Sequence, residues 1–270
     1  MKLPNLLDFD FSVDLWKIKP DLYIDLRPFP YGMIDQAYAY SFGGDVAVSS
    51  KEELVTVLGE KTKVGLILPN NMISSKFVLV PPEKSVEEII AAEFTQECAV
   101  DSFFICEMGL DRAYVVNAID EASRRIIETQ LPFLESSIIR ALPASFAVSQ
   151  FLVSSKDISG TFLVVETRSF EVYLYACAMM EGKIVTLSSD VVKTNIKNTL
   201  NEKVIFMNHK VVRFYRTDSI LQVFIVGENS PMPAGEITDI VLSTLKGKAN
   251  VETVEEAFPA IKGAWNFENS

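Results

Sequence analysis

The chain has 270 residues, of which 49% are hydrophobic and 23% are charged, and this composition excludes intrinsic disorder. Its net charge of -11 argues against general nucleic-acid binding and against docking on anionic lipid, because both need a basic surface. His209 is the only histidine, so His-based metal sites and Ser-His-Asp triads lack their main residue. Cys98, Cys106 and Cys177 have no Cys-x-x-Cys spacing, so we expect reduced thiols and no metal site.

The first elements are expected to be short strands followed by a helix. Three apolar or alternating runs predict strands, at residues 22–26, 33–40 and 46–48. Arg27-Pro28 would end the first strand, because proline has no amide to donate to a sheet. Ser49 or Ser50 would then cap a helix that ends at residue 58.

The next stretch, residues 64–118, is predicted to form a discrete small unit. Apolar runs at residues 64–68 and 72–80 both end at prolines, which indicates two strands. Ser85 and Glu88 have the spacing of a capping box and open a helix, and another strand begins at Phe103. We expect this strand-strand-helix-strand unit to be hinged to the rest of the first half.

The second half repeats the pattern of a strand triplet followed by helices. A turn-rich segment that ends at Gly160 marks the start of this second half. Before this boundary we expect a helix at residues 120–130, a strand at residues 138–139 and a helix at residues 143–152. The expected elements behind the boundary lie at residues 161–165, 171–177, 183–187, 190–215, 221–226, 233–245 and 251–254. Periodicity and order alone predict an α/β or α+β protein with two lobes.

Several features occur in a characteristic order, namely Leu68-Pro69, residues 79–82, a Glu- and Ala-containing helix at residues 87–94, Asp101 before Phe103, residues 115–118 before Glu121, and residues 140–147. In this order they resemble actin-like assembly proteins, namely the PilM family of type IV pilus systems and the cytoplasmic part of the GspL family of type II secretion. The resemblance implies an actin-like (ribonuclease H-like) fold with mixed sheets. Residues 1–63 and 119–152 would form the first lobe, residues 64–118 a small inserted subdomain, and residues 153–270 the second lobe.

The resemblance also implies where a nucleotide would bind, and the first phosphate loop departs from the family pattern. Actin-like ATPases carry Asp-x-Gly followed by Ser or Thr in each phosphate loop, so that backbone amides cradle the phosphates and the Asp orients magnesium or water. Here Asp25 is present, but Leu26 replaces the glycine and Arg27-Pro28 replaces the hydroxyl turn.

The other two nucleotide loops depart from the pattern as well. Glu166 supplies the acid of the second loop, but Arg168 stands where a small residue is wanted. In the glycine pair on the adenosine side, Gly227 remains and Glu228 replaces its neighbour. We therefore expect a degenerate nucleotide site at Asp25, Glu166 and Gly227, with no catalytic residue, no bound metal and no cofactor.

The main functional hypothesis is a non-enzymatic scaffold on the cytoplasmic side of a type IV pilus or type II secretion inner-membrane platform. The partners that the resemblance implies are platform membrane proteins and the motor ATPase, and a homodimer is left open. The alternative is a nucleotide-binding PilM-like ATPase that uses ATP and magnesium to regulate pilus assembly. A third hypothesis is an unrelated α+β protein. We expect a cytoplasmic location, with attachment to the inner membrane through partners or through a membrane segment beyond Ser270.

Two surfaces are candidates for binding these partners. Arg27, Phe29 and Tyr31 lie in a proline-rich stretch that predicts a stiff loop with exposed aromatic side chains, and aromatic residues are favoured at interfaces. The second candidate is the inserted unit around Asn70, Asn71 and Lys76. The C-terminal aromatic residues are expected to pack back on the first lobe instead, because an exposed tail of this composition is unfavourable.

Overall fold

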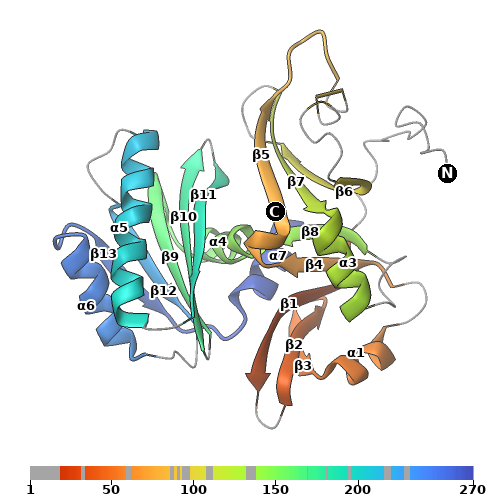
Figure 1. Cartoon of the computed structure of the whole chain (residues 1–270), viewed down its shortest axis with the longest axis horizontal. Helices are drawn as coiled ribbons and strands as arrows, with labels where there is room; N and C mark the ends of the chain where they lie inside the picture. Colours follow the sequence, from red (N-terminus) through yellow and green to blue (C-terminus); the bar gives the residue numbers. More distant parts are fainter. Residues whose placement is uncertain are drawn as a thin grey trace.

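The computed structural model describes residues 19–31, 34–58, 62–85, 88–89, 92, 98–107, 112–131, 138–168, 170–180, 182–193, 196–215, 220–227 and 232–269. Two five-stranded sheets face each other across a layer of helices, and a three-stranded sheet lies at one end of the first (Figure 1). No helix within these ranges is long and apolar enough to cross a membrane.

The first five-stranded sheet has the order β3-β2-β1-β4-β8. Its strands are β1 (Leu22–Tyr31), β2 (Ile34–Phe42), β3 (Asp45–Ser49), β4 (Val64–Leu68) and β8 (Ile138–Pro143). Strands β1 to β3 form an antiparallel meander, and β4 and β8 continue the sheet in parallel. Helices α1 (Lys51–Val57) and α3 (Glu121–Gln130) pack on its outer face through Leu54 and Ile127. We call this sheet and these helices the first lobe.

The second five-stranded sheet repeats the same plan, with the order β11-β10-β9-β12-β13. Its strands are β9 (Thr161–Arg168), β10 (Glu171–Met180), β11 (Lys183–Val192), β12 (Gln222–Val226) and β13 (Asn250–Val254). Strands β9 to β11 are antiparallel, and β12 and β13 are parallel to β9. This sheet and the two helices on its outer face, α5 (Ile196–Tyr215) and α6 (Ala234–Thr244), form the second lobe. The predicted duplication is thus confirmed at the level of topology.

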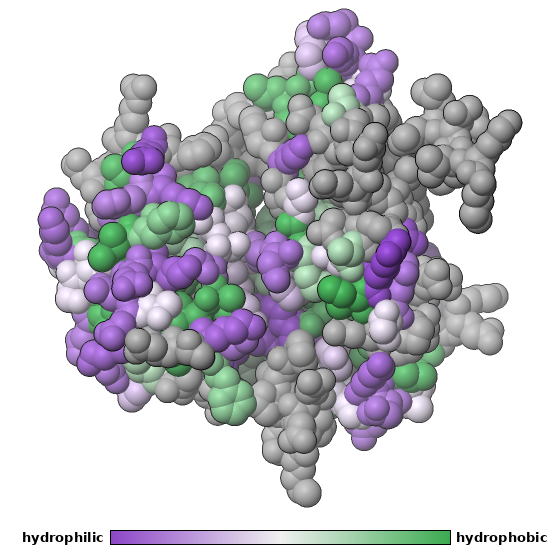
Figure 2. Space-filling model, viewed as in Figure 1, coloured by the Kyte–Doolittle hydropathy of each residue, from purple (hydrophilic) through white to green (hydrophobic). Residues whose placement is uncertain are grey.

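The surface of the second lobe is mixed in polarity. Ile205 and Phe206 of α5 are exposed, and the ammonium group of Lys210 lies over the Phe206 ring. Figure 2 shows such apolar residues dispersed among hydrophilic ones on this side of the molecule.

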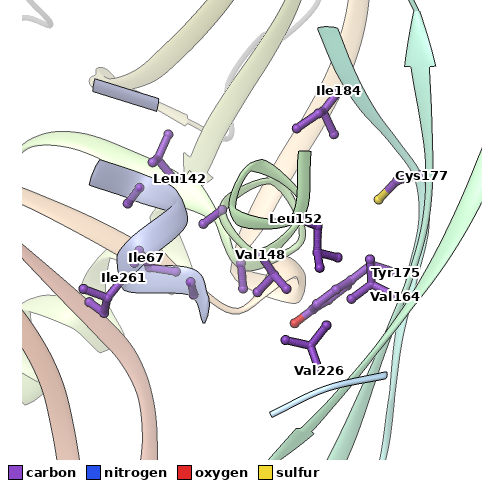
Figure 3. Close-up of a cluster of buried hydrophobic side chains, with 14 of the residues drawn as sticks. Ile67, Leu142, Val148, Leu152, Val164, Tyr175, Cys177, Ile184, Val226 and Ile261 are labelled. Atoms are coloured by element: carbon purple, nitrogen blue, oxygen red, sulfur yellow. The ribbon is translucent and has the colours of Figure 1, made fainter. Parts of the chain in front are cut away.

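Helices α4 (Ala144–Ser155) and α7 (Pro259–Asn269) lie between the two sheets and join the lobes. Figure 3 shows their apolar residues, among them Val148 and Ile261, beside Ile67 of the first sheet and Val164 of the second. The two helices approach very closely at Gly263, where an added Cβ would lie 1.7 Å from the carbonyl oxygen of Ala147. Glycine is therefore required at this crossing.

The C-terminal residues pack on the first lobe, as the sequence predicts. Trp265 meets Tyr23 of β1 edge to face, with 5.3 Å between ring centroids. The Tyr23 hydroxyl donates to Glu268 Oε1 at 2.5 Å, and Glu268 also pairs with Arg140 of β8. Helix α7 is thus anchored to the first sheet by both apolar and charged contacts.

The small sheet has the order β5-β7-β6 and follows a short 3₁₀ turn at Asn70–Met72. Its strands are β5 (Ile73–Leu79), β6 (Cys98–Glu107) and β7 (Ala113–Asp120). Ser85 and Glu88 form the predicted capping box, since each side chain accepts a bond from the other residue's backbone amide. Much of the helix predicted at residues 87–94 lies outside the described residues.

The predicted boundary at residue 64 is wrong, because β4 belongs to the first sheet. This strand lies between β1 and β8 and is buried along its whole length. Strands of a parallel sheet are covered on both faces and read as continuous apolar runs, and β4 is parallel to both of its neighbours. The separate sheet therefore begins at β5 and not at Val64.

The predicted end of the first strand at Arg27-Pro28 is also wrong, because β1 continues to Tyr31. Pairing with β2 persists through Phe29 and Tyr31, with register shifts on both sides of Phe29. Strand β4 pairs with β1 only as far as Asp25, so the prolines beyond it sit where one side of β1 is unpaired. Proline is tolerated at such edges and bulges.

Candidate functional site

The candidate site lies where β1 and β9, the middle strands of the two sheets, face each other. Each strand carries an acid-x-Arg pattern, Asp25-x-Arg27 in β1 and Glu166-x-Arg168 in β9. Alternate residues of a strand point to the same face, so the acid and the arginine of each pair share one side of their sheet. We call these four residues the interlobe ion cluster.

Arg27 connects the two lobes directly. Its Nε and Nη2 atoms donate to the Asp25 carboxylate at 2.9 and 2.8 Å. Its Nη1 atom donates across the interface to Glu166 Oε2 at 2.6 Å and to the Tyr175 hydroxyl at 2.9 Å. Its guanidinium also lies 5.2 Å from the centroid of the Tyr173 ring. One guanidinium thus contacts both sheets at once.

Arg168 makes the reciprocal connection from the second lobe to the first. Its Nη1 atom donates to Asp25 Oδ2 at 2.8 Å, and its Nη2 atom donates to the backbone carbonyl of Arg27 at 2.6 Å. The distance from Arg168 Nη1 to its own neighbour Glu166 is longer, at 4.0 Å. Each lobe therefore contributes an arginine that binds the acid of the other lobe.

The ion cluster is balanced in charge, and three of its four members are buried. Arg27 and Glu166 are each 1% exposed and Asp25 is 3% exposed. Burial by itself raises the pKa of Asp25, but the charges of Arg27 and Arg168 outweigh it and lower that pKa from 3.8 to about 2. Burial lowers the pKa of Arg27, but Asp25 and Glu166 outweigh it and hold that pKa well above its ordinary value. Asp25 and Arg27 therefore both stay charged near neutral pH.

Tyr175 completes the cluster on the side of the second lobe. Its hydroxyl donates to Glu166 Oε2 at 2.8 Å, and burial next to that carboxylate raises the tyrosine pKa well above its ordinary value. Tyr173 stacks beside it, with 6.3 Å between ring centroids. The cluster is therefore closed by aromatic side chains of β10.

Gly227 lies next to the same strand, directly after β12. Val226 is in register with Glu166, and the Thr167 hydroxyl donates to the carbonyl of Val226 at 3.3 Å. Gly227 has φ +128°, and an added Cβ would lie 2.3 Å from the carbonyl oxygen of Thr167. The three residues predicted for a degenerate nucleotide site are therefore brought together by the fold.

The residues present do not fit a nucleotide with magnesium. Asp25 already accepts four hydrogen bonds, from the backbone amide, Nε and Nη2 of Arg27 and from Nη1 of Arg168. A carboxylate offers about four lone-pair positions, so Asp25 has none left to orient magnesium or water. In the described part of the chain, no group of three His, Cys, Asp or Glu residues could hold a metal ion.

A second polar contact joins the lobes near the start of the small sheet. Asn70 donates to the Ser145 hydroxyl at 2.6 Å and accepts from the Ser145 backbone amide at 3.0 Å. The Ser145 hydroxyl lies 2.9 Å from the hydroxyl of Thr186 in β11. Asn70 thus stabilises the beginning of α4, because the first amides of a helix have no partner within it.

The structure changes the interpretation of the predicted partner-binding residues. Arg27 was expected in an exposed loop but is buried in β1, so it is not available at the surface. The backbones of Phe29 and Tyr31 lie in the same strand, and their side chains are outside the described part. In the second candidate surface Asn70 is engaged with Ser145, while Asn71 is exposed.

Lys76, the remaining candidate, lies in β5 of the small sheet and is half-buried. The six candidates therefore do not form one surface, because Arg27 is in the interior and Asn70 forms part of the contact with α4. Among the candidates whose side chains the structure describes, Asn71 is exposed, and Asn70 and Lys76 are partly accessible.

In the sequence, Arg27 and Arg168 stand out as departures from a family pattern, and Arg27 also as a partner-binding candidate. That each arginine binds the acid of the other lobe was missed. The available signal was the repeat itself, because acid-x-Arg occurs at the same place in both halves of a duplicated fold. Tyr175 was missed because its contact with Arg27 joins residues that are distant in the sequence.

Comparison with known proteins gives structural matches only. No protein-family model matches the chain, and no curated protein matches its sequence. A chain of the PilM-PilN type IV pilus biogenesis complex aligns with a TM-score of 0.63 and 13% identity, covering 93% of this chain and 99% of that one. A Bacteroides thetaiotaomicron protein with an actin-like ATPase fold and unknown function aligns at 0.50 and 11%, covering 96% and 99%.

A third match is the cytoplasmic domain of EpsL, an inner-membrane component of the type II secretion system of Vibrio cholerae. It aligns with a TM-score of 0.46 and 13% identity, covering 92% of this chain and 93% of that one. The first two alignments span nearly the whole of both chains, and they agree with the duplicated sheets described above. The chain therefore has the actin-like fold, similar to that in the PilM-PilN complex, as the resemblance in the sequence implied.

Proposed function

We propose that this protein is a non-enzymatic actin-like scaffold on the cytoplasmic side of a type IV pilus or type II secretion inner-membrane platform. It would act by binding membrane proteins of that platform. The observation that carries this proposal is the engagement of Asp25, whose four hydrogen bonds all come from Arg27 and Arg168. The similarity in fold to a chain of the PilM-PilN complex supports the choice of machine.

Charge and space together disfavour nucleotide binding between the two lobes. A nucleotide triphosphate brings several negative charges, and a phosphate loop receives them with backbone amides and glycine. Here the same place is filled by two guanidinium groups whose charges are neutralised by Asp25 and Glu166. Binding a phosphate would require separating these buried pairs, and breaking a buried pair typically costs about 3–5 kcal/mol.

Titration with a fluorescent ATP analogue in the presence of magnesium tests the first part of the proposal. We expect no saturable binding to the wild-type protein and no ATP hydrolysis above background. Asp25→Ala is the matched variant, because an orienting carboxylate is the one group that a functional site could not lose. Saturable micromolar binding that is lost in Asp25→Ala would establish the alternative, a PilM-like nucleotide-binding protein.

Capture of platform membrane proteins from solubilised inner membranes tests the second part. The captured proteins should be the same with and without ATP. Phe29→Ala and Tyr31→Ala should weaken binding at least about tenfold, because truncating an aromatic anchor typically costs about 2 kcal/mol. Phe170→Ala is the control, because Phe170 is also aromatic and is 69% exposed, and it lies away from the tested strand, at the turn between β9 and β10. Wild-type affinity in both folded variants would move the site to Asn71 and Lys76.

A further inference from the structure

The ion cluster has the form of a reciprocal connection between two lobes. Arg27 of the first lobe binds Glu166 of the second, and Arg168 of the second binds Asp25 of the first. Beside these contacts the interface is continued by α4 and α7, which pack against both sheets. A ligand that closes two lobes would make the same type of contact, since it must bind groups on both sides at once.

We infer that Arg27 takes the place of a ligand in this fold and holds the two lobes permanently closed. This inference rests on the proposed function, because it assumes that no nucleotide performs that task. A bound partner would then meet one fixed arrangement of the lobes, whatever the nucleotide concentration.

The chemistry of the guanidinium explains why an arginine suits this role. It is planar, always charged and carries five donors in a fixed geometry, whereas a lysine is a point charge on a flexible stem. Arg27 uses three of its nitrogen atoms for Asp25 and Glu166 in different lobes. It is also 1% exposed, so water cannot replace these bonds unless the lobes separate.

Cys177 provides a natural reporter of the closed state. It lies in β10 of the second lobe, is fully buried, and its sulfur is 3.2 Å from the Ser149 hydroxyl of α4. Figure 3 shows it on the same face of the sheet as Tyr175, towards α4. Alkylation of this thiol therefore requires that the second sheet and α4 move apart.

The experiment compares the alkylation rate of Cys177 in wild-type protein and in Arg27→Ala, measured by peptide mass spectrometry so that Cys98 and Cys106 do not contribute. The control is Arg124→Ala, which removes an arginine from a partly exposed pair on α3. We expect the Cys177 rate to rise at least about tenfold in Arg27→Ala, because local opening controls access to a buried group. The melting temperature of Arg27→Ala should fall by about 10 °C.

Rescue by a small cation makes the assignment specific. Arg27→Ala leaves a space lined by two carboxylates, so guanidinium chloride at concentrations too low to denature should restore protection of Cys177. Urea has a similar planar shape without the charge and should not, and neither should sodium chloride. If Arg27→Ala does not fold, Arg27→Lys is measured in the same way and should also raise the Cys177 rate, because it cannot reach both carboxylates in the same geometry.

The possible failures are distinguishable. Wild-type protection of Cys177 in folded Arg27→Ala or Arg27→Lys, or equal rescue by guanidinium and urea, would overturn the role of Arg27 and leave the absence of nucleotide binding intact. Saturable binding of the ATP analogue to the wild-type protein would instead overturn the proposed function.

Discussion

Arg27 Nη1 lies 2.6 Å from Glu166 Oε2, and this contact joins the middle strand of one sheet to the middle strand of the other. Buried ion pairs are not in general more stable than apolar packing, because both charges lose their hydration. Removing one partner of such a pair is strongly destabilising, however. The contact is therefore best understood as fixing one arrangement of the lobes, and its energetic importance should appear when a single member is changed.

Glu166→Gln should destabilise the protein more than Tyr175→Phe. The first change leaves the buried Arg27 and the partly buried Arg168 with one carboxylate, and we expect a loss of about 3 kcal/mol in the free energy of unfolding. The second removes one neutral hydroxyl, for which a loss of about 1 kcal/mol is typical. Urea denaturation at pH 7 measures both values. Equal losses in the two variants would mean that the hydroxyl, and not the charge, holds the cluster together.

Asp25 should make the stability depend on pH at the acid end. Its pKa is lowered to about 2 in the folded protein, so the stability that it contributes is fully present above pH 3.8 and is lost as the pH falls towards 2. The contribution corresponds to about 2 kcal/mol. Urea denaturation of the wild-type protein at pH 5, and again at about pH 2.5 to 3 where Asp25 titrates, measures this loss of stability. Asp25→Asn should show a weaker pH dependence in this range, and an unchanged slope would assign the acid sensitivity to other carboxylates.

Much of the fold could be predicted from local sequence patterns, because apolar runs and turn residues place most strands correctly. The neighbours with which a strand pairs are harder to predict from local patterns. The run Val64–Leu68 is evident, but its neighbours β1 and β8 are chosen by tertiary contacts that five apolar residues do not specify. The end of β1 was misplaced for a related reason, since pairing with β2 overrides the local effect of Pro28.

The site was predicted only in part. Asp25 and Glu166 were placed through a resemblance, and the fold does bring them to one interface. Arg27 was assigned to the surface because it begins a proline-rich stretch that predicts an exposed loop. Its burial depends on Glu166, which lies in the other half of the chain, and no local pattern contains that information.

Glu268→Ala should loosen the C-terminal helix from the first lobe. Glu268 accepts from Tyr23 and pairs with Arg140, whose side chain is 8% exposed, so the change leaves a buried cation without its carboxylate. We expect a loss of about 3 kcal/mol in the free energy of unfolding. The control is Lys262→Ala on the same helix, which breaks an exposed pair with Glu256 and should cost less than about 1 kcal/mol. Both values follow from chemical denaturation, and equal losses would contradict an anchoring role for Glu268.

Gly263→Ala adds one methyl group, and at no other place in the layer between the lobes should an added methyl group destabilise the protein more. An added Cβ would lie 1.7 Å from the carbonyl oxygen of Ala147 and 2.8 Å from the backbone amide nitrogen of Phe151. Both are backbone atoms of α4, so no side-chain rotation relieves the clash, and α4 and α7 must move apart. We expect a loss of about 3 kcal/mol or more in the free energy of unfolding, at the upper end for overpacking.

Gly235→Ala is the matched control for this change, because it places the same methyl group on a helix where nothing lies within 4 Å. Alanine favours helix over glycine, so Gly235→Ala should leave the stability unchanged or raise it by about 0.5–1 kcal/mol. Thermal unfolding followed by circular dichroism compares the two variants, and limited proteolysis shows whether α7 is released first. If Gly263→Ala melts with the wild-type protein and α7 stays protected, the close crossing of α4 and α7 does not hold the lobes together.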